Sequence, residues 1–311
     1  MKKKRCIVCH RKADVYIVYA NAAFCREHFI EFYERKILRT LKEAKFEGRR
    51  VLVAVSGGKD SVALLYALTS LAEALNIQIA ALHIDLRIGN YSEESVAIVE
   101  KIAHELKIPI RIVDVRDFLG VGLPEATRVT KRPACAVCGI VKRWIMNKIA
   151  YENGFDYIAT GHNIDDISAF WLKALLTQRE EDIIRDFSIV TPPNPDYRIV
   201  GRIRPQIFLS EQENMLYCLF KHAPFIQEIC PLSRGATLHR YKEIWGDILE
   251  VNPVSQINFV KSLLRLRERI EKPKINMTTC KICGFATTAK DSICAFCRLR
   301  LRIQSWKNSL S

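Results

Sequence analysis

Short apolar runs alternate with amphipathic segments along most of the chain. The runs have the length of buried strands, and the longer segments repeat their apolar residues at the spacing of a helix face. The predicted strands cover residues 51–55, 79–84, 110–115 and 157–160, and the predicted helices cover 61–74, 95–106, 138–151 and 166–176. Strands that alternate with helices predict an α/β fold with a parallel sheet covered on both faces. Ligands of such sheets bind beyond the carboxyl ends of the strands.

The character of the chain changes at three points, which divide it into four predicted segments. Residues 1–33 form a Cys- and His-rich unit, which we interpret as an N-terminal zinc finger, and residues 34–50 form a charged linker helix. Residues 51–251 carry the alternating pattern and form the predicted catalytic domain. Residues 252–311 begin with a helix and end in a second cysteine-rich unit, which is typical of a zinc ribbon.

The charge of the chain favours a polyanionic partner. Its 311 residues include 48 Lys or Arg and 34 Asp or Glu, which gives a formal net charge of +14. Between Lys261 and Lys307 there are twelve basic side chains and three acidic ones. Basic side chains gain affinity for nucleic acid because they release counterions condensed on the phosphates. We therefore predict that the C-terminal segment binds nucleic acid, the alternative being an ordinary solvated basic surface.

Nothing in the sequence predicts membrane insertion or export. The apolar runs fall short of the ~20 residues that a membrane helix needs. Cys6, Cys9 and His10 follow the basic start of the chain, where a signal peptide would have its apolar stretch. The 11 cysteines are odd in number and lie in close pairs, which is typical of metal binding in a reducing compartment. We expect a cytoplasmic protein without membrane association.

A glycine-rich turn joins the first predicted strand to its helix. It consists of Ser56, Gly57, Gly58, Lys59, Asp60 and Ser61. Two glycines let the backbone approach a phosphate closely, and the free amides at the helix start supply donors. The spacing differs from that of a Walker P-loop. The alternative is a tight strand–helix turn with a polar cap.

This turn resembles the signature of the PP-loop ATP pyrophosphatases, which cleave ATP between the α- and β-phosphates and adenylate a carbonyl oxygen. The resemblance implies a PP-loop domain, a Rossmann-like fold, in which further residues contact the nucleotide. His83 and Ile84 would lie around the adenine, and Val53 and Ala54 would offer backbone contacts. The run from Gly161 to Asp166 is similar to a Gly-His-x-x-Asp-Asp element of that family, which implies that Gly161, Asp165 and Asp166 belong to the site. Without the resemblance, this run reads as a glycine turn and a helix cap.

Two sets of paired residues have the spacing of tetrahedral zinc ligands. The predicted ligands are Cys6, Cys9, Cys25 and His28 near the start, and Cys280, Cys283, Cys294 and Cys297 near the end. Each unit is too small to fold on an apolar core alone, so the metal would supply its folding free energy. The sequence thus predicts two zinc ions, and unmetallated buried thiols are the alternative.

A third group of cysteines lies inside the predicted catalytic domain. Cys135 and Cys138 have no second pair nearby, and Cys230, which precedes a proline, is their natural partner. Three thiolates on a 4Fe–4S cluster leave one iron open to sulfide, which we favour over two alternatives. These are a third structural zinc completed by Cys218, and a dithiol–persulfide relay. Cys218 lies on an apolar helix face and reads as a core thiol.

Lys142 follows Cys138 by four residues, so a helix would place both side chains on the same side. A cation there could neutralise the α-phosphate of ATP during adenylation. The alternative is a solvated helix lysine beside Arg143.

The combination of a PP-loop, three central cysteines and two terminal zinc units resembles the tRNA 2-thiouridine synthetases over nearly the whole chain. This family includes the thymine-loop enzymes of thermophiles and the wobble-uridine thiolation enzymes. Supporting stretches are Cys25–Phe29, Glu34–Lys36, His83–Asp85, Cys135–Gly139 and Cys280–Gly284. The resemblance implies a homodimer that binds ATP and Mg²⁺, and sulfur from a ubiquitin-like carrier with a C-terminal thiocarboxylate. It also places the family's essential lysine and aspartate on Lys142 and Asp166.

The activity that the resemblance implies is adenylation of a tRNA uridine at its C2 oxygen, followed by replacement of that oxygen with sulfur. Two other functions stay open from the residues alone. One is 2-thiolation of cytidine, and the other is a non-catalytic, ATP-sensing zinc-ribbon protein that binds RNA. The sequence motifs do not separate the thymine-loop uridine from the wobble uridine. The predicted thiolation activity requires that the three central thiols converge beside the glycine-rich turn.

Overall fold

A six-stranded sheet forms the centre of the computed structural model, which describes residues 4–179, 181–183, 188–233, 235, 237–270 and 276–309. The strand order is β5-β4-β3-β6-β8-β7. The strands are β3 (Arg50–Ala54), β4 (Gln78–Asp85), β5 (Ile110–Asp114), β6 (Tyr157–Ala159), β7 (Val190–Thr191) and β8 (Gly201–Ile203). All neighbours pair in parallel except β7 with β8. The predicted parallel α/β fold is therefore confirmed.

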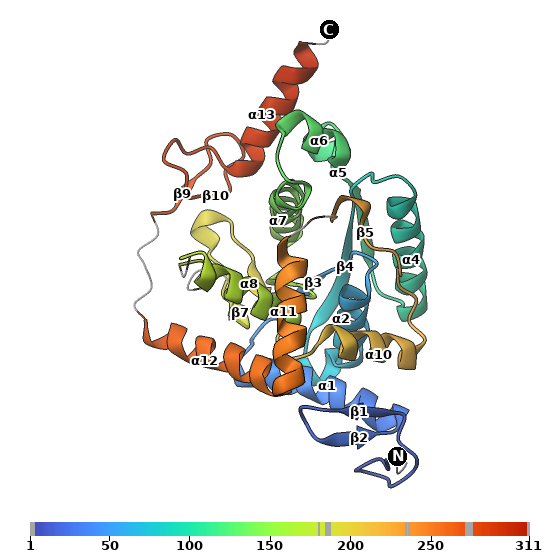
Figure 1. The fold of residues 1–311 in the computed structure, drawn as a ribbon. Coiled ribbons are helices and arrows are strands. Elements are labelled where there is room, and N and C mark those ends of the chain that lie inside the picture. The colour runs from blue at the N-terminus through green and yellow to red at the C-terminus, as the bar shows by residue number, and fades with distance from the viewer. Residues whose placement is uncertain are drawn as a thin grey trace.

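Helices cover both faces of this sheet (Figure 1). The helices that follow the strands of the central domain are α2 (Lys59–Ser70), α3 (Ala72–Leu75), α4 (Asn90–Leu106), α5 (Val115–Leu119), α6 (Leu123–Thr130), α7 (Ala134–Glu152), α8 (Ile164–Leu176), α10 (Glu211–Lys221), α11 (Thr237–Val251) and α12 (Ser255–Arg269). Two short 3₁₀ turns, η1 (Pro195–Tyr197) and η2 (Pro231–Ser233), lie in the connections. None of the described helices has the length and apolar character needed to cross a bilayer.

Side chains of the central strand β3 alternate between two apolar cores. Val51 and Val53 point into a first core that contains α2, α4 and α10, whereas Leu52 points into a second core that contains α5, α6 and α7. A third, smaller core lies between α8 and α12. The sheet thus separates two apolar cores, and residues at its carboxyl edge can contact elements from either face.

The N-terminal unit is a two-stranded hairpin, β1 (Val15–Ile17) and β2 (Ala22–Phe24), followed by α1 (Arg26–Glu43). α1 runs through the predicted border at residue 33, so the zinc-finger unit and the linker share one continuous helix. Its buried residues recur every four positions, at Phe29, Tyr33, Ile37 and Leu41, and pack into the first core. The unit is therefore joined to α2 and α10 by a common apolar interior.

The C-terminal unit contains the hairpin β9 (Thr278–Thr279) and β10 (Ala286–Thr287) and the final helix α13 (Ala295–Asn308). Its apolar residues pack into the second core, together with α5, α6 and α7. The preceding helix α12 packs against α8 instead. The N-terminal hairpin and α13 consequently lie at opposite ends of the molecule (Figure 1).

The helix that carries the paired central cysteines begins earlier than predicted. We expected it to cover residues 138–151, with Cys135 ahead of it, but α7 starts at Ala134 with Pro133 at its N-cap. The fixed φ of proline suits a helix entrance, so the helix can begin directly after it. Cys135 and Cys138 therefore lie in the first turn of α7.

Candidate functional site

The glycine-rich turn after β3 is held by hydrogen bonds between its own residues. The backbone N–H of Ser56 donates to the hydroxyl oxygen of Ser61 at 3.0 Å, and that hydroxyl donates to the Gly58 carbonyl at 3.0 Å. Gly58 is the N-cap of α2, in extended backbone. The first amides of α2 therefore face the turn, as an anion site requires.

Two glycines allow other elements to approach this turn. Gly57 has φ +84°, and a Cβ there would lie 3.1 Å from the Ser95 hydroxyl oxygen. A Cβ on Gly161 would lie 3.0 Å from backbone atoms of Asp60 and of Ser61. A side chain at either position would push α4 or the start of α8 away from the turn. The predicted site residue Gly161 thus lies directly against the turn.

Asp60 is held by a buried polar network that reaches the N-terminal helix. Asn163 and Asn214 donate to its carboxylate at 3.1 and 2.8 Å. Asn214 in turn accepts from the hydroxyl of Tyr33 at 2.6 Å, and the Gln206 amide donates to the Asp60 carbonyl at 3.1 Å. Burial raises the pKa of Asp60, while Lys59 and the asparagine amide oppose that effect. The first residues of α2 therefore depend on α1.

Charged side chains from three further elements surround the start of α2. Lys59 contacts Asp60 at 3.0 Å and Glu211 at 3.5 Å. Lys242 of α11 contacts Asp166 at 2.6 Å and also pairs with Glu211. Burial acts to lower the pKa of Lys242, but Asp166 and Glu211 outweigh it and raise the pKa above its ordinary value. Both lysines consequently stay charged.

The two aspartates of the predicted Asp-Asp element have different surroundings. Asp166 forms a capping box with Asn163 at the start of α8 and pairs with Lys242. Asp165 accepts from the Glu211 backbone N–H at 2.7 Å and from Gln256 at 2.9 Å. Burial raises the pKa of Asp165. The hydrogen bonds of Asp165 join α8 to α10 and α12.

A cavity of about 190 Å³ opens at the carboxyl edge of β3 and β4. Its lining includes the predicted site residues Ala54, Ser56, His83, Ile84, Cys138, Lys142 and Cys230. Val53 points into the first core, so only its backbone is available there. The ring of His83 donates through Nδ1 to the Val55 carbonyl at 2.8 Å, and burial lowers the pKa of His83. The cavity therefore joins the turn, the edge of β4 and the cysteine helix.

The three central thiols come from two adjoining elements. Cys135 and Cys138 lie in the first turn of α7, and Cys230 directly precedes η2, which packs against α7. Cys135 is exposed, whereas Cys138 and Cys230 are partly buried and line the cavity. Partial desolvation raises the pKa of Cys135, and the neighbouring Cys138 and Cys230 raise it further. In the described part of the chain these three are not among the ligand groups whose atoms all lie within 4.8 Å. Their spacing is wider than that around a single ion.

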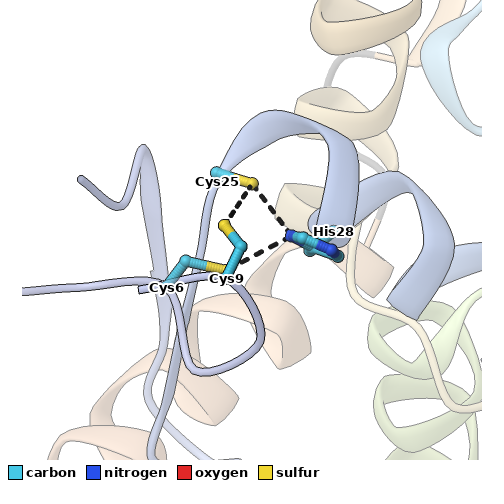
Figure 2. A group of neighbouring side chains, drawn as sticks. All are labelled: Cys6, Cys9, Cys25 and His28. Atoms are coloured by element: carbon cyan, nitrogen blue, oxygen red, sulfur yellow. Dashed lines mark hydrogen bonds between the residues drawn. The ribbon is translucent and has the colours of Figure 1, made fainter. Parts of the chain in front are cut away.

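The N-terminal ligand atoms face a common point (Figure 2). The Sγ atoms of Cys9 and Cys25 are 3.8 Å apart, and His28 Nδ1 lies 3.2 Å from Cys25 Sγ. Zn–S bonds of about 2.3 Å in a tetrahedron require sulfurs at about this separation. Burial opposes ionisation of Cys6, but the backbone amides of Cys9 and Cys25 lower the pKa of Cys6 to about 6. These groups are suited to hold a divalent cation.

The C-terminal ligand atoms are equally close. Cys283 Sγ lies 3.7 Å from Cys294 Sγ, and the backbone N–H of Cys294 donates to Cys280 Sγ at 3.3 Å. Burial opposes ionisation of Cys280, but the backbone amides of Cys294 and Cys283 lower the pKa of Cys280 to about 6. Both terminal sets therefore have the geometry predicted from their spacing.

Residues 30–219 match the PP-loop domain family, and residues 5–30 match the family described as 2-thiouridine synthetase TtuA, N-terminal LIM domain. A tRNA-5-methyluridine(54) 2-sulfurtransferase of Pyrococcus horikoshii is 37% identical, with 94% of this chain and 93% of that protein covered. The chain belongs to the PP-loop family of tRNA 2-sulfurtransferases. The enzyme of the same description from Thermus thermophilus is 36% identical, with coverage of 94% and 90%.

Among solved structures, the chain is similar to the U34-tRNA thiolase NcsA from Methanococcus maripaludis with its 4Fe–4S cluster. The TM-score is 0.81 at 26% identity, and 96% of each chain is covered. The family resemblance, the α/β PP-loop fold and the class of enzyme that we predicted are therefore confirmed. The roles of individual site residues, the homodimer and the sulfur carrier stay predictions.

Cys218 takes no part in the central group. It is fully buried in the first core, and its thiol donates to the Lys59 carbonyl at 3.3 Å. Cys138 and Cys230 pack against the second core, on the other side of the sheet. This position contradicts the alternative of a third zinc completed by Cys218, and it confirms that residue as a core thiol.

Sequence reasoning missed several polar residues that surround the turn. They are Tyr33, Asn163, Gln206, Glu211, Asn214 and Lys242. Asn163 had a signal, because it stands inside the Gly-His-x-x-Asp-Asp element and precedes a helix. The others lie far from any motif and meet the turn only through tertiary packing.

Proposed function

We propose that the chain is a tRNA-uridine 2-sulfurtransferase that adenylates the C2 oxygen of the base with ATP and replaces it with sulfur. One observation carries this proposal: Cys138, Cys230 and Lys142 line the same cavity as Ser56 of the PP-loop and His83. A single bound base can therefore meet the nucleotide and the thiols together. The membership of the tRNA 2-sulfurtransferase family supplies the reaction class.

ATP would lie across the carboxyl edge of the sheet. The adenine is proposed to lie against Ile84, Ala54 and neutral His83, with backbone contacts from Val53. The amides that begin α2 and the hydroxyls of Ser56 and Ser61 would bind the β- and γ-phosphates. Further residues in or near the turn complete the proposed nucleotide site, namely Gly57, Gly58, Lys59, Asp60, Gly161 and Asp165. ATP cleavage would then release pyrophosphate toward the turn and leave AMP on the base.

Lys142 and Asp166 have proposed roles on either side of the phosphates. Lys142 faces the cavity from α7, where its ammonium group would neutralise charge that develops on the α-phosphate. Asp166 begins α8 beside the turn and offers a carboxylate oxygen of the kind that Mg²⁺ prefers. Lys242 holds that carboxylate in the structure described here. This ion pair would orient the carboxylate for magnesium.

The central cysteines fit a multi-iron cluster better than a single ion. Cys135, Cys138 and Cys230 are near one another, but their atoms are spread beyond the spacing of the two terminal sets. We propose that they hold a 4Fe–4S cluster, whose iron without a protein ligand would bind the sulfide that replaces the oxygen. The relative NcsA is described with such a cluster. Lys142, one turn along α7, would keep the adenylated base next to these thiols.

The two terminal ligand sets are proposed to hold structural zinc ions. All eight ligands face inward with donor separations suited to a tetrahedral ion. Neither set lines the nucleotide cavity. The metals would therefore fold and attach their units rather than take part in sulfur transfer.

The proposed tRNA surface includes a cleft of about 310 Å³ beside the C-terminal unit. Arg132, Arg298 and Arg302 line it, together with Thr287 and Thr288. Arg132 stands three residues before Cys135, so phosphates bound in this cleft would lie beside the entrance to the thiol site. The homodimer and a ubiquitin-like carrier with a C-terminal thiocarboxylate are proposed from the family resemblance alone.

We propose the thymine-loop uridine at position 54 as the substrate, because the relatives named for that position are 34–37% identical. A wobble uridine is the second candidate, supported by the similarity to NcsA at 26% identity. The test is mass analysis of nucleosides from tRNA incubated anaerobically with the chain, ATP and sulfide. A 2-thio derivative of 5-methyluridine is expected. 2-Thiouridine confined to position 34, 2-thiocytidine, or no product would each contradict the proposal.

A matched variant tests the cluster assignment within the same assay. Cys230→Ser should abolish thiolation and lower iron content while ATP binding is retained, because the serine oxygen is a poor iron ligand and Cys230 lies outside the turn. Cys218→Ser is the control, since Cys218 is a core thiol on the other side of the sheet. It should keep its iron. An active Cys230→Ser variant would refute the role of the central thiols.

A further inference from the structure

Trp144 connects the catalytic helix α7 to the C-terminal ligand set. Its indole N–H donates to Cys283 Sγ at 3.5 Å. Its ring stacks on Phe296, with centroids 3.9 Å apart and planes within 6°. Phe296 stands between the ligands Cys294 and Cys297 and is 1% exposed. One side chain therefore touches a metal ligand and an aromatic ring held by two others.

The contact is enclosed by aromatic rings from two further elements. Phe118 of α5 and Phe285 of the C-terminal hairpin loop meet the indole edge to face, at 6.0 and 5.9 Å. Such aromatic arrangements have a preferred geometry, so the indole has little freedom to rotate. Trp144 is therefore held by α5 and by two parts of the C-terminal unit, its hairpin loop and α13. This unit, residues 276–309, is called the ribbon below.

The same helix presents its reactive residues on a different side. Cys138, Lys142 and Met146, spaced by four residues, line the nucleotide cavity. Trp144, Lys148 and Tyr151 follow one another along the side that faces the ribbon, where Tyr151 also meets Phe285. Because a helix turns as a rigid body, a rotation that moves the indole away from Cys283 moves Lys142 and Cys138 as well.

We propose that Trp144 is a positioning residue through which the metal-bound C-terminal unit sets the rotation of α7, and with it the placement of Lys142 and the central thiols. A bound metal would hold Cys283 as a thiolate, the form that accepts best from the indole. Without the metal, the ribbon has little to fold around and the indole loses its partner. The C-terminal unit would then serve the reaction centre as well as any RNA contact. The inference rests on the proposed function for the roles of Lys142 and the thiols.

The first experiment separates the hydrogen bond from the ring contacts. Trp144→Phe keeps a ring against Phe296 but loses the N–H, whereas Trp144→Leu loses both. Trp144→Phe is expected to release zinc to a chelator about tenfold faster, because hydrogen bonds to metal ligands support metal affinity. Its affinity for a non-hydrolysable ATP analogue should stay within about twofold of the parent, since the ring still fixes α7.

Trp144→Leu should release zinc at least as fast and, in addition, disturb the centre. Its iron content after anaerobic reconstitution is expected to fall by about half or more, and its dissociation constant for the ATP analogue to rise about tenfold. Tyr151→Leu is the matched control, because it removes an aromatic contact between the same helix and the same ribbon without touching a metal ligand. The control should retain both metals and ATP binding.

A second experiment approaches the same link from the ribbon. Cys283→Ser should lose one zinc ion and, in the absence of any tRNA, also bind the ATP analogue more weakly. If Cys283→Ser and Trp144→Leu both kept the parent's iron content and ATP affinity while only RNA binding fell, the ribbon would be an RNA appendage and the proposal would be overturned. A parent protein that binds no iron would instead count against the proposed function, whatever the variants do to ATP binding.

Discussion

The two terminal units carry similar sets of candidate metal ligands but contact different parts of the candidate site. The N-terminal unit reaches the PP-loop through polar contacts, because Tyr33 of α1 bonds Asn214, which bonds Asp60. The C-terminal unit reaches the cysteine helix through an aromatic stack and a bond from Trp144 to a ligand sulfur. The N-terminal unit shares the apolar core of α2, which begins at the turn, whereas the C-terminal unit shares the core of α7 on the other side of the sheet. The two ligand sets are therefore expected to have different roles, although their residue types are similar.

The strongest test removes one ligand from each unit. Cys25→Ser and Cys294→Ser should each lose one zinc, and with it metal-binding free energy on the order of 10 kcal/mol that folds the unit. Cys25→Ser is expected to weaken binding of an ATP analogue more than iron binding, because α1 supports Asp60. Cys294→Ser should lower iron content as well as affinity for the ATP analogue, because it disturbs α7, which carries both Lys142 and two of the central thiols. Metal analysis and calorimetric titration measure both quantities, and equal losses in both variants would break the comparison.

The polar link of the N-terminal unit can be cut without touching a metal ligand. Asn214→Leu leaves the partly buried Asp60 carboxylate and the fully buried Tyr33 hydroxyl with one partner fewer each. We expect a loss of about 3 kcal/mol in the free energy of unfolding, with weaker ATP binding, because buried polar groups without partners are costly. Urea unfolding measures the change. Gln212→Leu, on an exposed position of the same helix, should stay within about 0.5 kcal/mol.

Lys242 tests whether a third region, α11, acts on the PP-loop half. Lys242→Met removes the cation that contacts Asp166 and Glu211. We expect kcat to fall about tenfold, equal to about 1.4 kcal/mol of transition-state free energy, because Asp166 loses the partner that orients it. Lys242→Arg should restore most of the rate, since the charge is kept. Thiolation rates at varied ATP and Mg²⁺ separate kcat from KM. If Lys242→Met left the rate unchanged, α11 would have no role in the reaction.

The smallest effect concerns His83, which lies where the two halves meet. Burial lowers the pKa of His83 below its ordinary 6.5, so the neutral ring is favoured in the folded state. Because the unfolded state binds the proton more tightly, the free energy of unfolding is highest above pH 6.5 and falls as the pH drops from 6.5 through the folded pKa. The slope is at most about 1.4 kcal/mol per pH unit. Thermal unfolding of the parent and of His83→Gln between pH 5 and 8, at roughly half-unit steps, measures it. The two curves should diverge below pH 6.5.

The main features of the fold could be predicted because short, continuous apolar runs indicate buried strands directly. The four predicted strands lie within a residue of β3, β4, β5 and β6, since each is flanked by glycine, polar residues or a helix start. β7 and β8 have two and three residues, too few for a pattern, and their pairing depends on β6 beside them. The early start of α7 was missed because its first turn contains cysteines and small residues rather than an apolar stripe.

The ligand sets of the site were predictable for a different reason. Zinc ligands of this type usually come in pairs with short spacing, so the pair Cys280 and Cys283 can be recognised directly in the sequence. The residues that hold the site in place, such as Asn214 and Trp144, have no such pattern in the sequence. Asn214 is 154 residues from Asp60, and Trp144 is 139 residues from Cys283, so only the folded chain brings each pair together. Each stands alone in its helix without a paired residue at a fixed spacing, so no spacing rule selects it.

The continuity of α1 has a practical consequence for anyone who divides the protein. Phe29, Tyr33, Ile37 and Leu41 are completely buried, and the helix passes from His28, a candidate metal ligand, into the main interior without a break. A fragment that starts after residue 43, at the end of α1, would expose to solvent the apolar sides of α2 and α10 that this helix covers. Such a fragment should aggregate. Exchanging this finger between relatives would likewise demand that the helix and its receiving surface be transplanted together.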